Sequence, residues 1–421
     1  ANRYFKYTAF VETDETYRQY GIENLDDLKA FAEKWYGAED KDNPKSRNNA
    51  LNKFMSYHLL DREVAYNRLV CYNIKNDYYN SEVNFKKNAD RYEYYESMLK
   101  YTLFKVIKKL SNSEHSQYLY LNFSDRETIN PEMNNHLNIK IYSASEVKDL
   151  GEEYEGFNPS AINGTIHIID KIMVYNEDEM AGNVLNERIR MDISALFPEF
   201  TNNGVRWDLS SPGNLVTFIP SGFCKYFVVN NTDTEVFYFR PHQTYLGSYA
   251  NYQGDEFIVE GKYDFQYRIP HVPAGDYEIR FGYPKGYYRG VCQFYVDGKI
   301  AGIPVDLRWN TDTDLIIGWI ADTGLSEDEI KENDKAMKNR GYMKGPSSII
   351  LDKDSKGTMR DSEQALRKII GTYRLGKSNH WLRFKDVTEG GTGKLNQFDQ
   401  DYIELVPTIV LSDPNKPEDT F

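Results

Sequence analysis

The sequence predicts an α+β domain followed by an all-β domain built as a sandwich or barrel. A chain of 421 residues is too long for one compact core, so two domains are expected. Helical spacing of apolar residues is confined mainly to the first part of the chain. From about residue 205 onward, short strands and turns alternate, which is typical of a sandwich or barrel.

The first domain, expected over residues 1–176, starts with a strand at Tyr7 to Val11. Thr13 then offers a helix N-cap. Apolar residues at intervals of three and four predict helices over residues 25–36 and 50–59, and His58 lies on the apolar face of the second. Residues 96–110 fit either a helix or a strand. Two more strands are expected at residues 118–123 and 137–142.

The stretch from Asn163 to Asp170 closes the first domain. Asn163-Gly164 is the preferred pair for a type I′ hairpin turn, in which both central residues need positive φ. The residues that follow are almost continuously apolar, so this strand is expected to be covered on both faces. His167 alternates with isoleucines on it, and we interpret it as a structural side chain near His58.

A linking helix is expected over residues 177–204, because its leucines, isoleucines and valine recur at helical spacing. The all-β domain then runs over residues 205–411, and residues 412–421 are expected to be a loose tail. Residues 326–339 predict a charged, exposed helix, and residues 362–370 fit a helix or a strand. Nine strands are expected in this domain: 215–219, 226–229, 236–239, 257–260, 265–269, 277–281, 291–296, 381–384 and 402–406.

Charge and motif content exclude several classes of function. The net charge is −13 and the pI about 5.2, which argues against nucleic-acid and acidic-membrane partners. Three scattered cysteines form no knuckle or disulfide framework, although a bridge between Cys224 and Cys292 stays possible. Histidine spacing gives no zinc motif, so neither a metal nor a cofactor is expected. The chain has no nucleophile elbow or phosphate loop, and no enzyme activity is expected.

The candidate ligand-binding residues are Tyr287, Tyr288, Arg289, Trp309 and Trp319. The first three lie in a glycine-flanked loop between two strands, where aromatic rings and a guanidinium can stack on and hydrogen-bond to a sugar. The alternative is a packed loop whose rings cover the sandwich edge. Of the two tryptophans, one is expected in the core, and the other can serve as a stacking platform.

Three segments give the first domain a family resemblance. Thr8 to Glu15 resembles the first conserved box of fasciclin domains, with Glu12 in place of the family's proline. Tyr57-His58 is similar to the central Tyr-His pair, and Asn163 to Asp170 resembles the second box. The resemblance implies an α+β fasciclin fold and an adhesion role.

The second domain resembles galactose-binding-like jelly rolls that follow fasciclin domains in surface lipoproteins of Gram-negative gut bacteria. The residues that carry this resemblance are 272–280, 291–305, 380–384 and 401–407. Together the two resemblances imply a lipid anchor upstream of residue 1, missing from this chain, and a place on the outer-membrane surface beside a nutrient importer.

These inferences favour a non-enzymatic lipoprotein of the cell surface, accessory to an outer-membrane uptake system, that binds glycan or another nutrient. The second hypothesis is an adhesion or assembly module that docks a partner protein or transporter complex. The third is an esterase or glycosidase, which would need a buried carboxylate pair with perturbed pKa values in a cleft.

Overall fold

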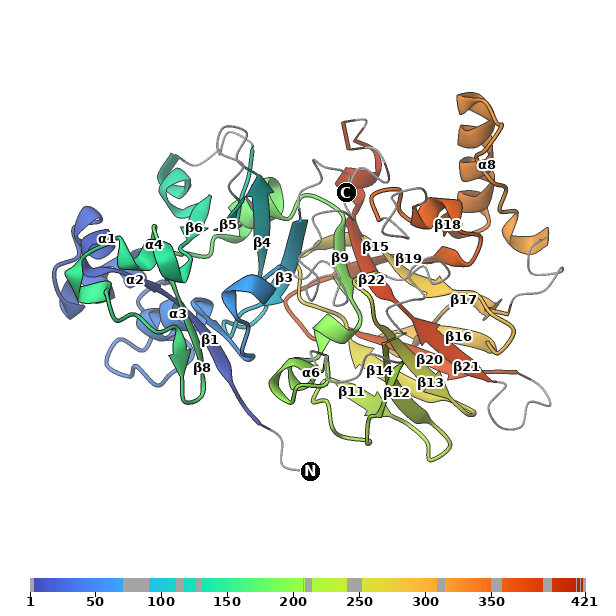
Figure 1. Ribbon diagram of the computed structural model, residues 1–421, viewed down its shortest axis with the longest axis horizontal. Helices are drawn as coiled ribbons and strands as arrows, with labels where there is room; N and C mark the ends of the chain where they lie inside the picture. Colours follow the sequence, from blue (N-terminus) through green and yellow to red (C-terminus); the bar gives the residue numbers. More distant parts are fainter. Residues whose placement is uncertain are drawn as a thin grey trace.

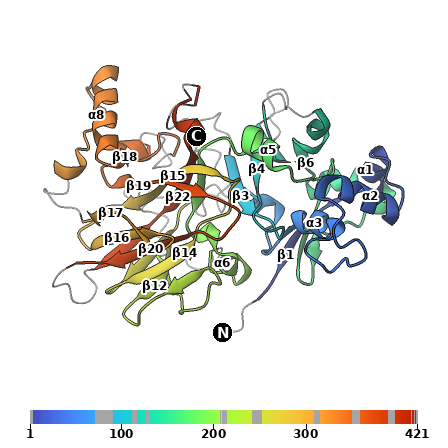
Figure 2. The same ribbon diagram turned by 180° about the vertical axis from the view of Figure 1, so that it is seen from behind.

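The computed structural model describes residues 4–70, 91–110, 117–125, 131–206, 208, 214–240, 252–308, 315–349, 358–388, 396–413, 415–416 and 418. Within them the chain is mostly β-sheet with some helices. Figure 1 shows two halves side by side, with the N-terminal half at the left and the β-rich C-terminal half at the right. Figure 2 shows the same division from behind. Buried apolar residues of both halves belong to one contiguous cluster.

The N-terminal half is a mixed sheet covered by helices, with strand order β2-β1-β8-β6-β5-β4-β3 and β7 beside β8. Strands β1 and β8 are parallel, and the other pairs are antiparallel. The strands are β1 Tyr7–Glu12, β2 Leu59–Leu60, β3 Arg91–Glu96, β4 Leu103–Leu110, β5 Gln117–Leu121, β6 Ile139–Ile141, β7 Ser160–Ala161 and β8 Gly164–Ile169. The helices are α1 Asp14–Gln19, α2 Leu25–Tyr36, α3 Ala50–Tyr57 and α4 Ala144–Lys148.

The predicted helix starts of this half are confirmed. Thr13 caps α1, its hydroxyl accepting from the amide of Thr16 at 3.1 Å. Helix α2 has the expected span, and residues 103–110 form a strand. Helix α3 ends at Tyr57, before the expected residue 59, because Leu59 starts strand β2.

The hairpin before β8 is present, but the expected type I′ turn is wrong. Ala161 pairs with Gly164, so Ile162 and Asn163 are the central residues, and neither has a positive φ. Gly164 is needed for a different reason, since a Cβ there would collide with the carbonyl oxygen of Tyr7 on β1. Glycine at this position permits the close parallel pairing of β1 and β8.

The two histidines interpreted as structural, His58 and His167, both have hydrogen-bond partners. The Nε2 of His58 lies 2.8 Å from Oε1 of Glu12, and its Nδ1 lies 2.8 Å from the carbonyl oxygen of Phe54. The Nε2 of His167 lies 2.8 Å from the carbonyl oxygen of Val64. Burial lowers the pKa of His167 to about 4, so the ring is neutral near pH 7.

Residues 177–204 do not form the single linking helix that the spacing suggested. They hold α5 Glu177–Glu179, one π-helical turn at Met180–Val184, β9 Ile189–Asp192, a 3₁₀ turn at Ser194–Leu196 and α6 Pro198–Asn202. Strand β9 pairs with β22, so the chain belongs to the C-terminal half from Ile189 onward. Pairing with a distant strand overrides the local helical pattern here.

The C-terminal half is an antiparallel β-sandwich. One sheet has the order β11-β14-β20-β16-β17, and it faces two others, β10-β12-β13-β21 and β18-β19-β15-β22-β9. Aromatic rings fill the space between the layers, with Phe384 of β20 4.6 Å from Phe398 of β21 and 5.9 Å from Phe281 of β15, measured between ring centroids.

The strands of this half are β10 Leu215–Phe218, β11 Phe227–Val229, β12 Glu235–Arg240, β13 Glu256–Glu260, β14 Asp264–Arg268, β15 Gly275–Pro284, β16 Val291–Val296, β17 Lys299–Asp306, β18 Tyr342–Lys344, β19 Ala365–Leu375, β20 Trp381–Asp386, β21 Gln397–Gln400 and β22 Tyr402–Pro407. The helices are α8 Glu327–Asn339, which projects at the upper right of Figure 1, and α9 Thr408–Leu411. Cys224 and Cys292 are both buried and free, so the possible disulfide is absent.

The C-terminal segment is held by charge, whereas a loose tail was expected. Arg280 of β15 donates to both carboxylate oxygens of Glu418, at 3.0 and 2.9 Å, and Arg188 Nε donates to Oε2 at 2.8 Å. Burial disfavours the ionised form of Glu418. The hydrogen bonds and the charge of Arg280 outweigh this effect of burial and hold the pKa of Glu418 well below its usual range. These ion pairs tie Glu418 to the sandwich.

Candidate functional site

The predicted aromatic loop lies between β15 and β16, and it exposes its two tyrosines. Tyr287 is 68% exposed and Tyr288 61%. Both rings are accessible on a loop that a rigid sandwich carries, as expected for a stacking surface.

Arg289 faces into the protein and does not offer its guanidinium to a ligand. Its Nε donates to the carbonyl oxygen of Pro284 at 3.0 Å, and its terminal nitrogens donate to Gln397 and, at 2.5 Å, to Asp399. Burial raises the pKa of Asp399 to about 6, against the opposing effect of Arg289. The expected hydrogen-bond fork is used to hold the loop on β21.

Of the two predicted tryptophans, the structure describes Trp319 alone. Trp319 is partly buried against the hydrophobic core, and the Lys344 ammonium lies 5.7 Å from its ring centroid. Trp309 lies outside the described residues.

A larger concave site lies between the two halves, in a cleft of about 1000 Å³. The N-terminal half contributes the loop before α3, one face of α3 and the turn from β3 to β4. The C-terminal half contributes the residues before β11 and after β14. This volume is at the upper end of the range for small-ligand pockets.

A part-buried ion pair joins the two walls at the cleft. Arg268 donates to Oε1 and Oε2 of Glu96 at 2.8 and 2.6 Å, in a two-pronged geometry. The backbone amide of His271 donates to the same carboxylate at 2.8 Å. Burial alone would raise the pKa of Glu96, but Arg268 and His271 lower it well below the usual range. Glu96 is therefore ionised, and both of its carboxylate oxygens accept hydrogen bonds.

Two tyrosines lie beside the ion pair of Glu96 and Arg268. The Arg268 guanidinium lies 3.9 Å from the ring centroid of Tyr226, which fixes the plane of that ring. The ring of Tyr101 meets His271 edge-on at 5.0 Å. Tyr101 has a φ of +64°, a left-handed backbone conformation that is uncommon for a non-glycine residue and occurs often at binding sites.

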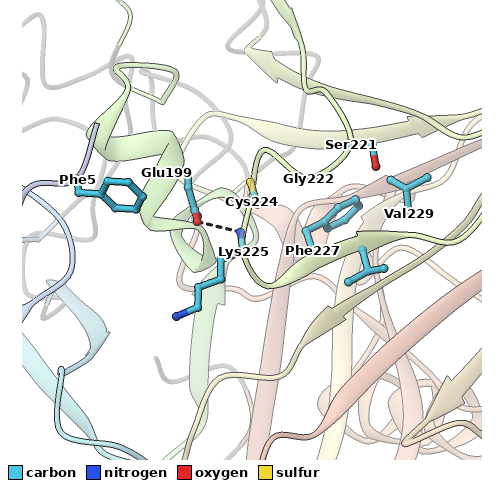
Figure 3. A pocket seen from close by; sticks show the side chains of 9 residues that line it. Phe5, Glu199, Ser221, Gly222, Cys224, Lys225, Phe227 and Val229 are labelled. Atoms are coloured by element: carbon cyan, nitrogen blue, oxygen red, sulfur yellow. Dashed lines mark hydrogen bonds between the residues drawn. The ribbon is translucent and has the colours of Figure 1, made fainter. Parts of the chain in front are cut away.

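A second pocket of about 410 Å³ shares Lys225 with the cleft. Figure 3 shows Phe5 on one side of it and Phe227 and Val229 on the other. The amide of Lys225 donates to Oε1 of Glu199 at 2.9 Å, and its long side chain points away from the apolar wall.

A network of buried polar groups lies at the same junction of the halves. Glu93 of β3 accepts from Gln253 at 2.9 Å, and Arg206 donates to Asp255 at 3.4 Å. Asp192 also lies beside Arg206, at 3.5 Å, and burial raises the pKa of both Asp255 and Asp192. Neither has any exposed side-chain surface, so this carboxylate pair offers no access to a substrate.

Among the described residues, no group of three or more His, Cys, Asp or Glu side chains is positioned to hold a metal ion. No helix in the same part of the chain is both long and apolar enough to cross a membrane.

Sequence reasoning missed the cleft because its walls come from segments more than 300 residues apart. Asn48 and Tyr101 look like ordinary loop residues, and Asn379 follows a charged turn. A possible signal was the basic and aromatic character of Lys100-Tyr101 and Lys225-Tyr226, each beside a strand.

Comparison with known proteins gives only distant similarities. No family model and no curated protein matches the sequence. Among solved structures, a Paenibacillus xanthan lyase matches 72% of this chain with 13% identity and a TM-score of 0.24, and the match spans about a fifth of its length (20%). A family 35 carbohydrate binding module from Clostridium thermocellum matches 46% of this chain and 90% of its own, with 9% identity and a TM-score of 0.17. A Bacteroides uniformis beta-glucuronidase matches 37% of this chain over 11% of its own length, with 13% identity and a TM-score of 0.18. TM-scores this low support neither a fold assignment nor a function.

Proposed function

We propose that this chain is a non-enzymatic glycan-binding protein of the outer cell surface, lipid-anchored and accessory to an outer-membrane nutrient uptake system. The observation that carries the proposal is the cleft between the halves. It combines a large volume with two oriented tyrosine rings and several amide and charged side chains, the mixture that sugars require for stacking and hydrogen bonding. The resemblance to fasciclin and galactose-binding-like domains supports the cell-surface placement.

Isothermal titration calorimetry against neutral and acidic oligosaccharides tests this function. Tyr101→Ala and Tyr287→Ala are compared in otherwise identical protein. If the cleft binds glycan, Tyr101→Ala weakens affinity about tenfold, since stacking on an aromatic ring contributes about 1 kcal/mol or more. Tyr287→Ala then has little effect. If Tyr287→Ala weakens glycan affinity more than Tyr101→Ala does, the site lies on the exposed loop. If no glycan binds at all, the proposal fails.

A second function, adhesion or assembly through a partner protein or transporter complex, is favoured by one feature. Strand β17 is at the end of its sheet, and Ile300 and Ile303 on it are 68% and 82% exposed. An edge strand with apolar side chains can pair with a strand of another protein. Ile303→Lys is expected to abolish co-purification with such a partner from membranes without changing glycan affinity. Unchanged recovery would count against this role.

A further inference from the structure

The cleft between the halves is basic although the chain as a whole is acidic. Six lysine or arginine side chains and two carboxylates line it, whereas the chain carries a net charge of −13. One of the two carboxylates, Glu96, is already used by Arg268 and His271. The remaining positive charge therefore has little compensation within the cleft.

Several of these cations have no acidic partner among the described residues. Elsewhere in the same half, Lys29 lies 2.9 Å from Asp26, Lys41 2.9 Å from Glu33 and Lys34 3.0 Å from Glu132. Lys45, Arg47 and Lys100 form no ion pair with any residue that the structure describes. In a chain with 64 acidic against 51 basic residues, these three unpaired cations gather in one cleft.

The cations come from both walls of the cleft. Lys45, Arg47 and Lys100 extend from the N-terminal half. Lys225 extends from the C-terminal half, with its ammonium 4.7 Å from the Tyr226 ring centroid. An anion between the halves would therefore meet positive charge from two sides, beside an aromatic ring that is held in place by Arg268.

We propose that the cleft binds a short acidic oligosaccharide, whose carboxylate or sulfate groups pair with Lys45, Arg47, Lys100 and Lys225 while a sugar ring packs on the tyrosines. This inference rests on the proposed glycan-binding function and specifies its ligand class. Arginine and lysine favour anionic oxygens, and arginine can engage a planar carboxylate with two donors. A nucleic acid fits less well, because the acidic remainder of the protein would repel a long polyanion beyond the cleft.

Calorimetry with matched ligand pairs tests the inference. Each acidic oligosaccharide is compared with its carboxyl-reduced or desulfated counterpart, which keeps the same sugar skeleton. The acidic member is expected to bind about tenfold more tightly, and about 0.5 M sodium chloride should remove most of that difference by screening. A single-stranded oligonucleotide of similar charge provides the comparison with nucleic acid.

Charge-neutralising variants locate the effect. The triple change Arg47→Ala, Lys100→Ala and Lys225→Ala should weaken acidic ligands about tenfold and neutral ligands hardly at all, since each exposed charge pair contributes a factor of about 1.5 to 5. The matched control, Lys148→Ala, Lys299→Ala and Lys335→Ala, removes the same charge from outside the cleft. It should leave both affinities unchanged, because only local charge matters here.

The outcomes separate the two proposals. Equal binding of each acidic ligand and its neutral counterpart would overturn the acidic-ligand inference and leave the glycan function standing. Equal loss in the two triple variants, or tighter binding of the oligonucleotide, would also overturn the inference. If no oligosaccharide binds, the glycan function itself fails.

Discussion

At the residue scale, Glu12 and His58 form a polar pair inside the core of the N-terminal half. Both side chains are almost fully buried, at 1% and 3% exposed. Glu12 accepts from the amide of Met173 at 3.2 Å and from the Tyr17 hydroxyl at 3.0 Å in addition to its contact with His58. Burial opposes protonation of His58, but the Glu12 charge outweighs it and raises the pKa of His58.

The raised pKa of His58 predicts a specific pH dependence of stability. The folded state binds the His58 proton more tightly than the unfolded chain, so this contribution is complete below about pH 6.5 and is lost as the pH rises through the higher folded pKa. Glu12→Gln should lower the free energy of unfolding by about 3 kcal/mol at pH 6 and by less at pH 9. Denaturant unfolding at both pH values measures this.

The exposed neighbour provides the control for that prediction. Glu15 is 68% exposed and pairs with Arg18 at 3.2 Å, so Glu15→Gln should change stability by less than about 0.5 kcal/mol. Equal losses in the two variants, or a loss in Glu12→Gln that does not depend on pH, would refute the charged pair.

The sequence could predict the class of these histidines but not their partners. His58 on an apolar helix face and His167 on a covered strand were interpreted as structural, and their hydrogen bonds agree. Proximity of the two was expected, yet each is bonded to a different group. Glu12 was noted only as a substitution for proline, because the fold that brings it to His58 is not encoded in local pattern.

At the element scale, the parallel pairing of β1 and β8 organises the N-terminal half. Six consecutive residue pairs join them, from Tyr7 with Gly164 to Glu12 with Ile169. The pairing starts at Gly164, where the β1 backbone approaches too closely for a side chain.

Gly164→Ala is therefore expected to destabilise the protein by about 2 to 3 kcal/mol, because the new methyl group must displace the backbone of β1. Gly156→Ala is the matched control, since a Cβ there meets nothing within 4 Å and its φ is not positive. Thermal unfolding of both variants measures the difference. A Gly164→Ala protein as stable as the Gly156→Ala protein would contradict the close approach.

Element types were predictable where one periodicity dominates. Helices α2 and α3 show apolar residues at intervals of three and four, and the strands of the sandwich alternate or are continuously apolar between turns. The prediction of one helix over residues 177–204 failed because Ile189 fits helical spacing with Ile193 as well as it fits strand β9. Only the distant partner β22 decides between the two, and short-range pattern does not contain it.

At the scale of the whole molecule, the decisive feature is the junction of the halves, where the candidate site lies. Asn202 of α6 accepts from the amide of Glu63 and donates to the carbonyl oxygen of Asp61, both at 3.0 Å. The sequence predicted two parts and their classes, but a junction made by segments so far apart has no local signature. The exposed tyrosine loop could be inferred from the sequence, whereas the cleft required the fold.

The ion pair of Glu96 and Arg268 is expected to couple the two halves energetically. Arg268 is 7% exposed, and removal of its partner would leave a buried charge unpaired. Glu96→Ala should therefore cost about 3 kcal/mol, and the double variant Glu96→Ala with Arg268→Ala should cost clearly less than the sum of the single changes. Denaturant unfolding of the four proteins gives the coupling energy. Additive losses would show that the pair does not join the halves.

The pH dependence of the same pair has the opposite sign to that of His58. Because Arg268 holds the pKa of Glu96 far below its usual value, the folded state binds that proton less tightly than the unfolded chain. The stabilisation is present above the unfolded pKa of about 4.5 and is lost as the pH falls below it. Wild-type protein should thus lose stability between about pH 5 and pH 3 more steeply than Glu96→Ala. Asp26→Ala, which removes a pair with exposures of 49% and 89%, should leave that slope unchanged, since such pairs contribute less than about 1 kcal/mol.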